Sequence, residues 1–295
     1  TGASVVVAVL GTQVSVYGLF RFVLPLFPVA SVDLAALMSG AAAAGIVYAA
    51  LVGLVQADLK RVALFVAMGH LGFTVLGLFA FNVPGLEGGL IHIVARSGVV
   101  AGLLLLAGML EQRRGTRAIT EYGGIAKPMP VFAFFFAVVV LAGAGVPLLS
   151  SFVGEFLVLF GTFETGVGRA AVAVLGAALI GIVVLRTFSR VALGAVENPE
   201  NRGLIDLTWL ERGVMLAVVV PLIWIGVQPE ILTSRLHQPV LKLRREMLER
   251  ANETHRTYPD PSVRRAIERL AARNASVPAM TLAQDAVVPA VGKER

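Results

Sequence analysis

The feature that most constrains this chain is a series of long apolar runs, each close to the length of a membrane-spanning helix. A helix needs about 20 mostly apolar residues to cross a bilayer. Seven candidate segments occur in the 295-residue sequence, at 4–24, 34–56, 62–81, 88–110, 131–163, 169–188 and 213–227. We therefore expect an all-α membrane protein, a bundle of about seven transmembrane helices.

The fifth segment is too long for one straight helix. Pro147 lies inside it, after Gly143 and Gly145, and proline removes a backbone donor and clashes with the preceding turn. We expect two helical pieces, near 131–145 and 151–163. Broken helices in membranes often border a site or a water path, so this segment is a prime candidate for function.

Composition agrees with a membrane protein and excludes several kinds of site. The chain is 57% hydrophobic and 15% charged, whereas soluble domains are roughly 45–50% apolar and about 25% charged. It has no cysteine, which excludes disulfides, thiolate zinc sites, iron–sulfur ligation and cysteine nucleophiles. The four histidines are scattered along the sequence and do not suggest a metal cluster.

Charge and loop patterns predict two regions and an orientation. We assign 1–235 to the membrane bundle and 236–295 to a polar, basic tail of two short amphipathic helices with a break at 259–261. Such a tail is typical of a solvated segment beside the membrane, not of nucleic-acid binding. Loops after the second, fourth and sixth segments carry most of the Lys and Arg residues, which places them and the N-terminus in the cytoplasm and the tail on the opposite side.

Titratable residues within the apolar segments are candidates for function, because burying charge in a bilayer is costly. Glu155 follows the proline break, and we interpret it as a proton-carrying carboxylate, with a structural ion pair as the alternative. His70 and His92 lie within the third and fourth segments. Each is either a member of a proton relay or a buried, hydrogen-bonded histidine.

Three further polar residues complete the candidate path. Arg96 lies one helical turn after His92 and cannot cycle a proton at neutral pH, although it can tune a neighbouring carboxylate. Gln13 in the first segment can bridge a water chain but cannot titrate. Lys60 lies at a helix junction, where anchoring at the membrane interface is the simpler interpretation. Together these residues indicate a carrier or channel of small cations, most simply protons.

Five short segments carry a resemblance to a known family. They lie at 17–28, 56–61, 69–73, 121–127 and 152–156, and include Gly-His-Leu-Gly-Phe at 69–73 and Phe-Val-Gly-Glu-Phe at 152–156. Together they resemble the antiporter-like proton-translocating subunits of respiratory complex I, NADH:quinone oxidoreductase, and most closely its M-type subunit (mitochondrial chain 4). The resemblance covers residues 1–238, and the tail has no counterpart that we identify.

The resemblance implies a fold of fourteen transmembrane helices, of which this chain carries the eighth to the fourteenth. Because the sequence starts at Thr1, not Met, we expect either processing or a piece of a longer chain. The implied role is proton translocation coupled to electron transfer from NADH to quinone in a bacterial inner membrane. FMN, iron–sulfur clusters and quinone would bind to other subunits, with no cofactor or metal in this chain. The implied partners are other membrane-arm subunits, including neighbouring antiporter-like subunits, and the lipid bilayer.

The family's functional positions carry over only in part. Glu155 matches the broken-helix glutamate, and His70 matches the first relay histidine. The next relay position, usually histidine, is Arg96, and the central lysine of the eighth helix is Gln13. We therefore hypothesise impaired or rerouted proton conduction. A cation/proton antiporter subunit, a membrane-bound hydrogenase subunit and a degenerate structural subunit remain the alternatives.

Overall fold

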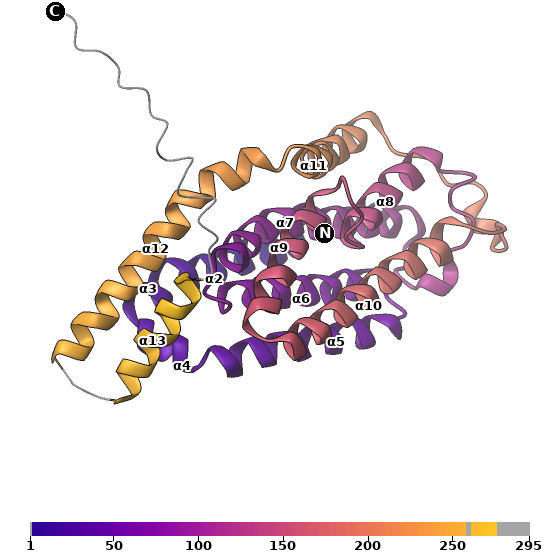
Figure 1. The fold of residues 1–295 in the computed structure, drawn as a ribbon. Helices are drawn as coiled ribbons and strands as arrows, with labels where there is room; N and C mark the ends of the chain where they lie inside the picture. Colours follow the sequence, from indigo (N-terminus) through magenta and orange to yellow (C-terminus); the bar gives the residue numbers. More distant parts are fainter. Residues whose placement is uncertain (1, 258–260, 276–295) are drawn as a thin grey trace, which may run out of the picture.

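The computed structural model describes residues 2–257 and 261–275, which form a bundle of helices (Figure 1). Six helical segments in this part of the chain are long and apolar enough to cross a membrane. They are Gly2–Leu26 (α1 to α3, with two π-helical turns), α5 (Ala35–Leu54), α6 (Leu59–Leu78), α7 (Val83–Arg114), α10 (Val167–Ala192) and α11 (Trp209–Val227). With the broken fifth segment, these confirm the predicted bundle of about seven spans.

The predicted break in the fifth segment is confirmed. α8 (Pro130–Gly143) ends before it and α9 (Ser150–Thr165) begins after it. Gly145, in the turn, has a φ of +69°, a left-handed conformation that glycine adopts without a Cβ penalty. Leu148 also has a positive φ of 72°, which is uncommon for a side chain of this size.

Side-chain caps begin three of the spanning helices. Asp58 accepts hydrogen bonds from the backbone nitrogens of the first turn of α6, and Asn82 accepts one from Gly85 at the start of α7. Thr208 and Glu211 form a capping box at the start of α11. These polar residues satisfy backbone donors that have no partner within the helix, and they fix where each helix begins.

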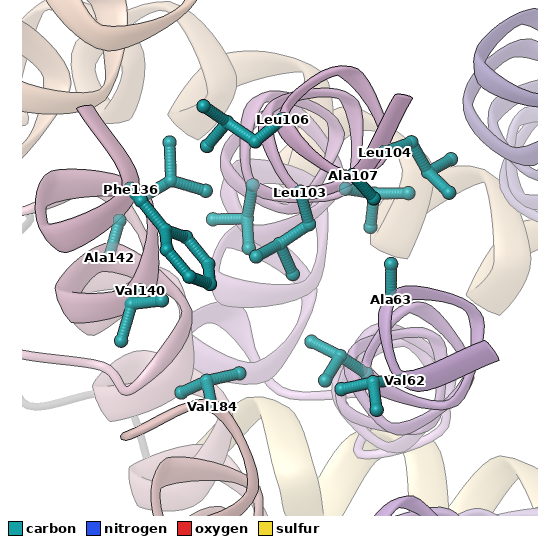
Figure 2. Packing of buried hydrophobic residues seen from close by; sticks show 14 of the residues in the cluster. Val62, Ala63, Leu103, Leu104, Leu106, Ala107, Phe136, Val140, Ala142 and Val184 are labelled. Atoms are coloured by element: carbon teal, nitrogen blue, oxygen red, sulfur yellow. The ribbon is translucent and has the colours of Figure 1, made fainter. Parts of the chain in front are cut away.

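The main hydrophobic core lies between α6, α7, α8 and α10 (Figure 2). Val62, Leu103, Phe136, Val140 and Val184 are among its buried members. The outside of the bundle is also apolar, with large exposed side chains that include Leu37, Phe134 and Leu175. A water-soluble monomer rarely exposes so many apolar side chains, so this surface fits a lipid environment.

The loops that carry most of the Lys and Arg residues, called the basic loops, lie together at one end of the bundle. The loop before α6 meets the loop after α7 through a bridge between Asp58 and Ala118. The segment between α10 and α11 joins them, since Gly124 donates a backbone hydrogen bond to Leu193. This is the end that the distribution of Lys and Arg predicts to be cytoplasmic.

The tail packs at the opposite end, beside α3 and α4 (Pro28–Asp33) in Figure 1. Its first helix, α12 (Glu230–Thr257), runs through the predicted boundary between residues 235 and 236. It has 28 residues and is therefore not the short helix that we expected. α13 (Pro261–Ala275) folds back against α12 and α4. Most of the predicted break at 259–261 lies outside the described residues.

Candidate functional site

Three titratable side chains from three helices meet beside the break between α8 and α9. Nδ1 of His70, on α6, lies 3.1 Å from Nε2 of His92, on α7. The same Nδ1 lies 3.5 Å from Oε1 of Glu155, on α9. Both histidines are fully buried, and Glu155 is 9% exposed. We call these three residues the His–His–Glu cluster.

Glycines allow α9 to approach α7 closely at the cluster. A Cβ at Gly154 would lie 2.8 Å from Cα of His92, and a Cβ at Gly88 would lie 2.6 Å from the backbone nitrogen of Val158. Any larger residue at either position would push the two helices apart, as expected for small residues at membrane helix interfaces. The short separation of Glu155 from the histidines therefore depends on these glycines.

The broken helix places the Glu155 carboxylate against its own turn. A Cβ on Gly145 would overlap Oε2 of Glu155, so the turn has no room for a side chain at this position. The positive φ of Gly145 adds a second requirement for glycine. Gly145 thus helps to position the carboxylate.

Several buried polar atoms at and near the cluster have no hydrogen-bond partner among the described residues. They are His70 Nε2, His92 Nδ1, Arg96 Nε and Nη1, Ser150 Oγ and Ser151 Oγ. An unsatisfied buried polar group costs roughly 1–3 kcal/mol, and in proteins ordered water commonly meets such groups. The surroundings of the cluster are therefore polar and suited to proton exchange.

Arg96 lies near the cluster but does not pair with its carboxylate. It is 1% exposed, and its Nη2 donates to the carbonyl oxygen of Ala67 at 3.5 Å. Among the described residues it forms no ion pair, and the ion contact of Glu155 is with His70. The structure therefore provides no direct Arg96–Glu155 pair through which arginine could hold this carboxylate ionised.

Gln13 connects the first span to α7 beside Arg96. Its amide donates a hydrogen bond to Oγ of Ser97, which in turn donates to the carbonyl oxygen of Ile93. Ser97 is not among the residues that the sequence singles out, because nothing in the pattern of residues shows that the two helices meet there. The two positions that depart from the family pattern, 13 and 96, are thus close in space.

Lys60 lies away from the cluster. It pairs with Glu111 at the basic end of the bundle, and it precedes His70 by ten residues, or about 15 Å along a helix. The structure therefore places Lys60 as an interfacial ion pair and does not bring it to the His–His–Glu cluster.

The cluster also has the donor atoms of a metal site. Its two ring nitrogens and one carboxylate oxygen lie within 4.8 Å of one another, a donor set that zinc uses in proteins. The fixed positive charge of Arg96, one turn from His92 along α7, opposes a bound cation. We therefore interpret the cluster as a hydrogen-bonded histidine pair with a carboxylate beside it, and assign no metal to it.

Comparison with known proteins adds to this geometry. Residues 1–181 match the family model described as "NADH:quinone oxidoreductase/Mrp antiporter, TM". The chain belongs to this family. It is 32% identical to NADH-quinone oxidoreductase subunit M of Rickettsia prowazekii over 243 residues, which cover 82% of this chain and 50% of that protein. It is also 32% identical to NADH-ubiquinone oxidoreductase chain 4 of Marchantia polymorpha, over 82% of this chain and 49% of that protein.

Solved structures of other proteins have the same fold as this chain. A chain of respiratory complex I from Thermus thermophilus superposes with a TM-score of 0.76 at 32% identity, over 81% of this chain and 51% of that chain. A chain of the Mrp complex from Dietzia shares the fold, with a TM-score of 0.69 at 19% identity. The chain spans about half the length of the curated relatives it matches.

Proposed function

We propose that this chain is part of a membrane-arm subunit of NADH:quinone oxidoreductase and contributes to proton translocation driven by electron transfer from NADH to quinone. The observation that carries the proposal is the His–His–Glu cluster, buried beside a broken helix in a member of this family. The 32% identity to complex I subunits, against 19% to the Mrp chain, favours complex I over a cation/proton antiporter.

The geometry supports proton exchange along the cluster. A neutral imidazole accepts a proton on its unprotonated ring nitrogen and becomes an imidazolium. Nδ1 of His70 faces both Oε1 of Glu155 and Nε2 of His92, so this one atom can take a proton from the carboxyl group and pass it to the second ring. Arg96 keeps its charge and acts on the cluster electrostatically, without carrying the proton.

The redox chemistry belongs to other parts of the enzyme under this proposal. This chain supplies no redox cofactor, and FMN, iron–sulfur clusters and quinone bind to other subunits of the complex. Its partners are other membrane-arm subunits, including neighbouring antiporter-like subunits, within a bacterial inner membrane. The translocase is thus multisubunit, and the chain contributes a proton path to it.

Co-purification followed by a transport assay tests the proposal. Mass spectrometry of the complex isolated from native membranes in mild detergent should detect flavin- and cluster-binding, NADH-oxidising subunits. Liposomes that contain this complex should then take up protons when NADH is oxidised. Hydrogenase or cation-antiporter partners would contradict the assignment to complex I. Normal pumping by a Glu155→Gln complex would instead indicate that this chain has a structural role.

A further inference from the structure

We propose that Glu87 on α7 and His237 on α12 form a proton-release site at the outer end of the bundle. This inference rests on the proposed function and adds to it a place where protons leave the chain. Neither residue belongs to the His–His–Glu cluster, and neither is among the site residues predicted from the sequence.

The two groups are in direct contact. Nδ1 of His237 lies 2.6 Å from Oε1 of Glu87, within hydrogen-bond distance. The Glu87 side chain is 11% exposed and the His237 side chain is 32% exposed. The pair therefore has a nearly buried carboxyl group on one side and a solvent-accessible imidazole on the other.

The pair occupies the position that proton release requires. Glu87 lies in the second turn of α7, at the end opposite the basic loops, and is therefore on the outer side by the positive-inside rule. His92 follows five residues later, about 7.5 Å further along the helix axis. Glu87 faces α12 whereas His92 faces His70 on α6, so the two groups have different partners, and the proposal requires water to carry a proton across this interval.

Tail packing holds His237 in place. Val240, Leu243 and Met247 of α12 are buried in a cluster with residues of the first span and the start of α7. Arg250 donates to the carbonyl oxygen of Pro25, and Arg269 of α13 pairs with Asp33 of α4. The imidazole is thus anchored by several contacts that involve no group of the release site.

The proposed proton transfer from Glu87 to solvent needs no other reactant. Protonated Glu87 gives its proton to Nδ1 of His237, which leaves a carboxylate and an imidazolium. The imidazolium releases the proton on Nε2 to solvent. Exchange of the remaining Nδ1 proton through solvent returns the ring to its starting tautomer, and the carboxylate is ready for the next proton from inside.

Other charged groups near the tail are occupied elsewhere. Glu164 at the end of α9 accepts a hydrogen bond from Asn82 and interacts electrostatically with Arg244 of α12. Lys242 pairs with Glu246 on the exposed face of α12. The ion contact of Glu87 is with His237, so these two groups form a discrete acid–base pair among the described residues.

Chemical rescue in the reconstituted complex tests the proposal. We would measure NADH-driven proton pumping into liposomes for His237→Ala, Glu87→Gln, Glu155→Gln and, as a matched control, Arg269→Gln, which breaks a tail contact without removing a release group. We expect a several-fold lower pumping rate in His237→Ala and Glu87→Gln and an unchanged rate in Arg269→Gln. Added imidazole should restore His237→Ala but not Glu155→Gln.

The outcomes separate this inference from the proposed function. Normal pumping by His237→Ala and Glu87→Gln overturns the release site, and so does a loss in His237→Ala that imidazole does not restore, since that result indicates a structural role. Normal pumping by Glu155→Gln contradicts the proposed function. The response of His237→Ala to imidazole tests the release site separately.

Discussion

α7 presents two polar sites that differ in what they can do with a proton. His92 meets His70 and Glu155, which are all titratable side chains. One turn further on, Arg96 and Ser97 meet the carbonyl oxygen of Ala67 and the amide of Gln13, and none of these groups exchanges a proton at neutral pH. One turn of helix thus separates a group that can gain and lose a proton, His92, from one whose charge is fixed, Arg96.

The difference follows from what each site packs against. The titratable site lies against the broken helix, where glycines bring Glu155 close to the histidines. The other site, Arg96 and Ser97, is called the fixed site. It meets α6 at Ala67 and the first span at Gln13, and the first span is mostly exposed in this chain. The titratable side chains are thus gathered where α7 and α9 approach each other closely.

Removal of the cluster's carboxyl group should reduce proton pumping more than any other change considered below. Glu155→Gln retains the shape and a hydrogen-bonding group but cannot take up or release a proton. In the reconstituted complex we expect NADH-driven pumping to fall about tenfold or more. Glu249→Gln, on the exposed face of α12, is the matched control and should pump normally. Equal pumping by both variants would contradict a proton-carrying role for Glu155.

A substitution that separates α9 from α7 should have the next largest effect on stability and pumping. Gly154→Ala places a methyl group 2.8 Å from Cα of His92, and overpacking of this kind typically costs about 1–3 kcal/mol. We expect a lower melting temperature of the complex and slower pumping, because Glu155 moves away from the histidines. Gly213→Ala is the control: its Cβ meets open space, so no loss of stability is expected. A Gly154→Ala complex as stable and active as the parent would show that the close contact is not needed.

Restoration of the family pattern at the fixed site tests whether it limits conduction. Gln13→Lys together with Arg96→His exchanges a fixed charge for a switchable group and adds a titratable amine. We expect the proton-to-electron ratio of the reconstituted complex to rise in the double variant. A full ratio in the unchanged complex would rule out impaired conduction.

Loss of the hydrogen bond between the first span and α7 should have the smallest effect on stability and pumping. Ser97→Ala removes the acceptor of the Gln13 amide, and a hydrogen bond of this kind contributes about 1 kcal/mol. We expect a small decrease in thermal stability and little change in pumping. A pumping loss as large as that of Glu155→Gln would show that the fixed site also carries protons.

Much of this architecture could be predicted from sequence because it depends on local patterns. Runs of apolar residues predicted the spans, and Pro147 predicted the break between α8 and α9. Glu155, His70 and His92 were chosen because a titratable residue inside an apolar run is costly. The structure shows in addition that these three residues meet.

The remainder depends on contacts between distant segments, which no local pattern encodes. Glu155 lies close to the histidines because Gly88 of α7 and Gly154 of α9 each allow the backbone of the other helix to approach. Lys60 was included among the path candidates because it lies at the end of a span, and only its contact with Glu111 shows its place. The length of α12 also escaped prediction, because a polar helix gains much of its stability from tertiary packing of one face.

Infrared difference spectroscopy of the complex, recorded between its oxidised and NADH-reduced states, can detect whether the Glu155 carboxyl group takes up or releases a proton. If Glu155 exchanges a proton during turnover, the spectrum should contain a protonated-carboxyl band that is absent from the Glu155→Gln complex and present in the Glu249→Gln control. An identical carboxyl region in the parent and Glu155→Gln spectra would contradict the claim that the His–His–Glu cluster carries the proton.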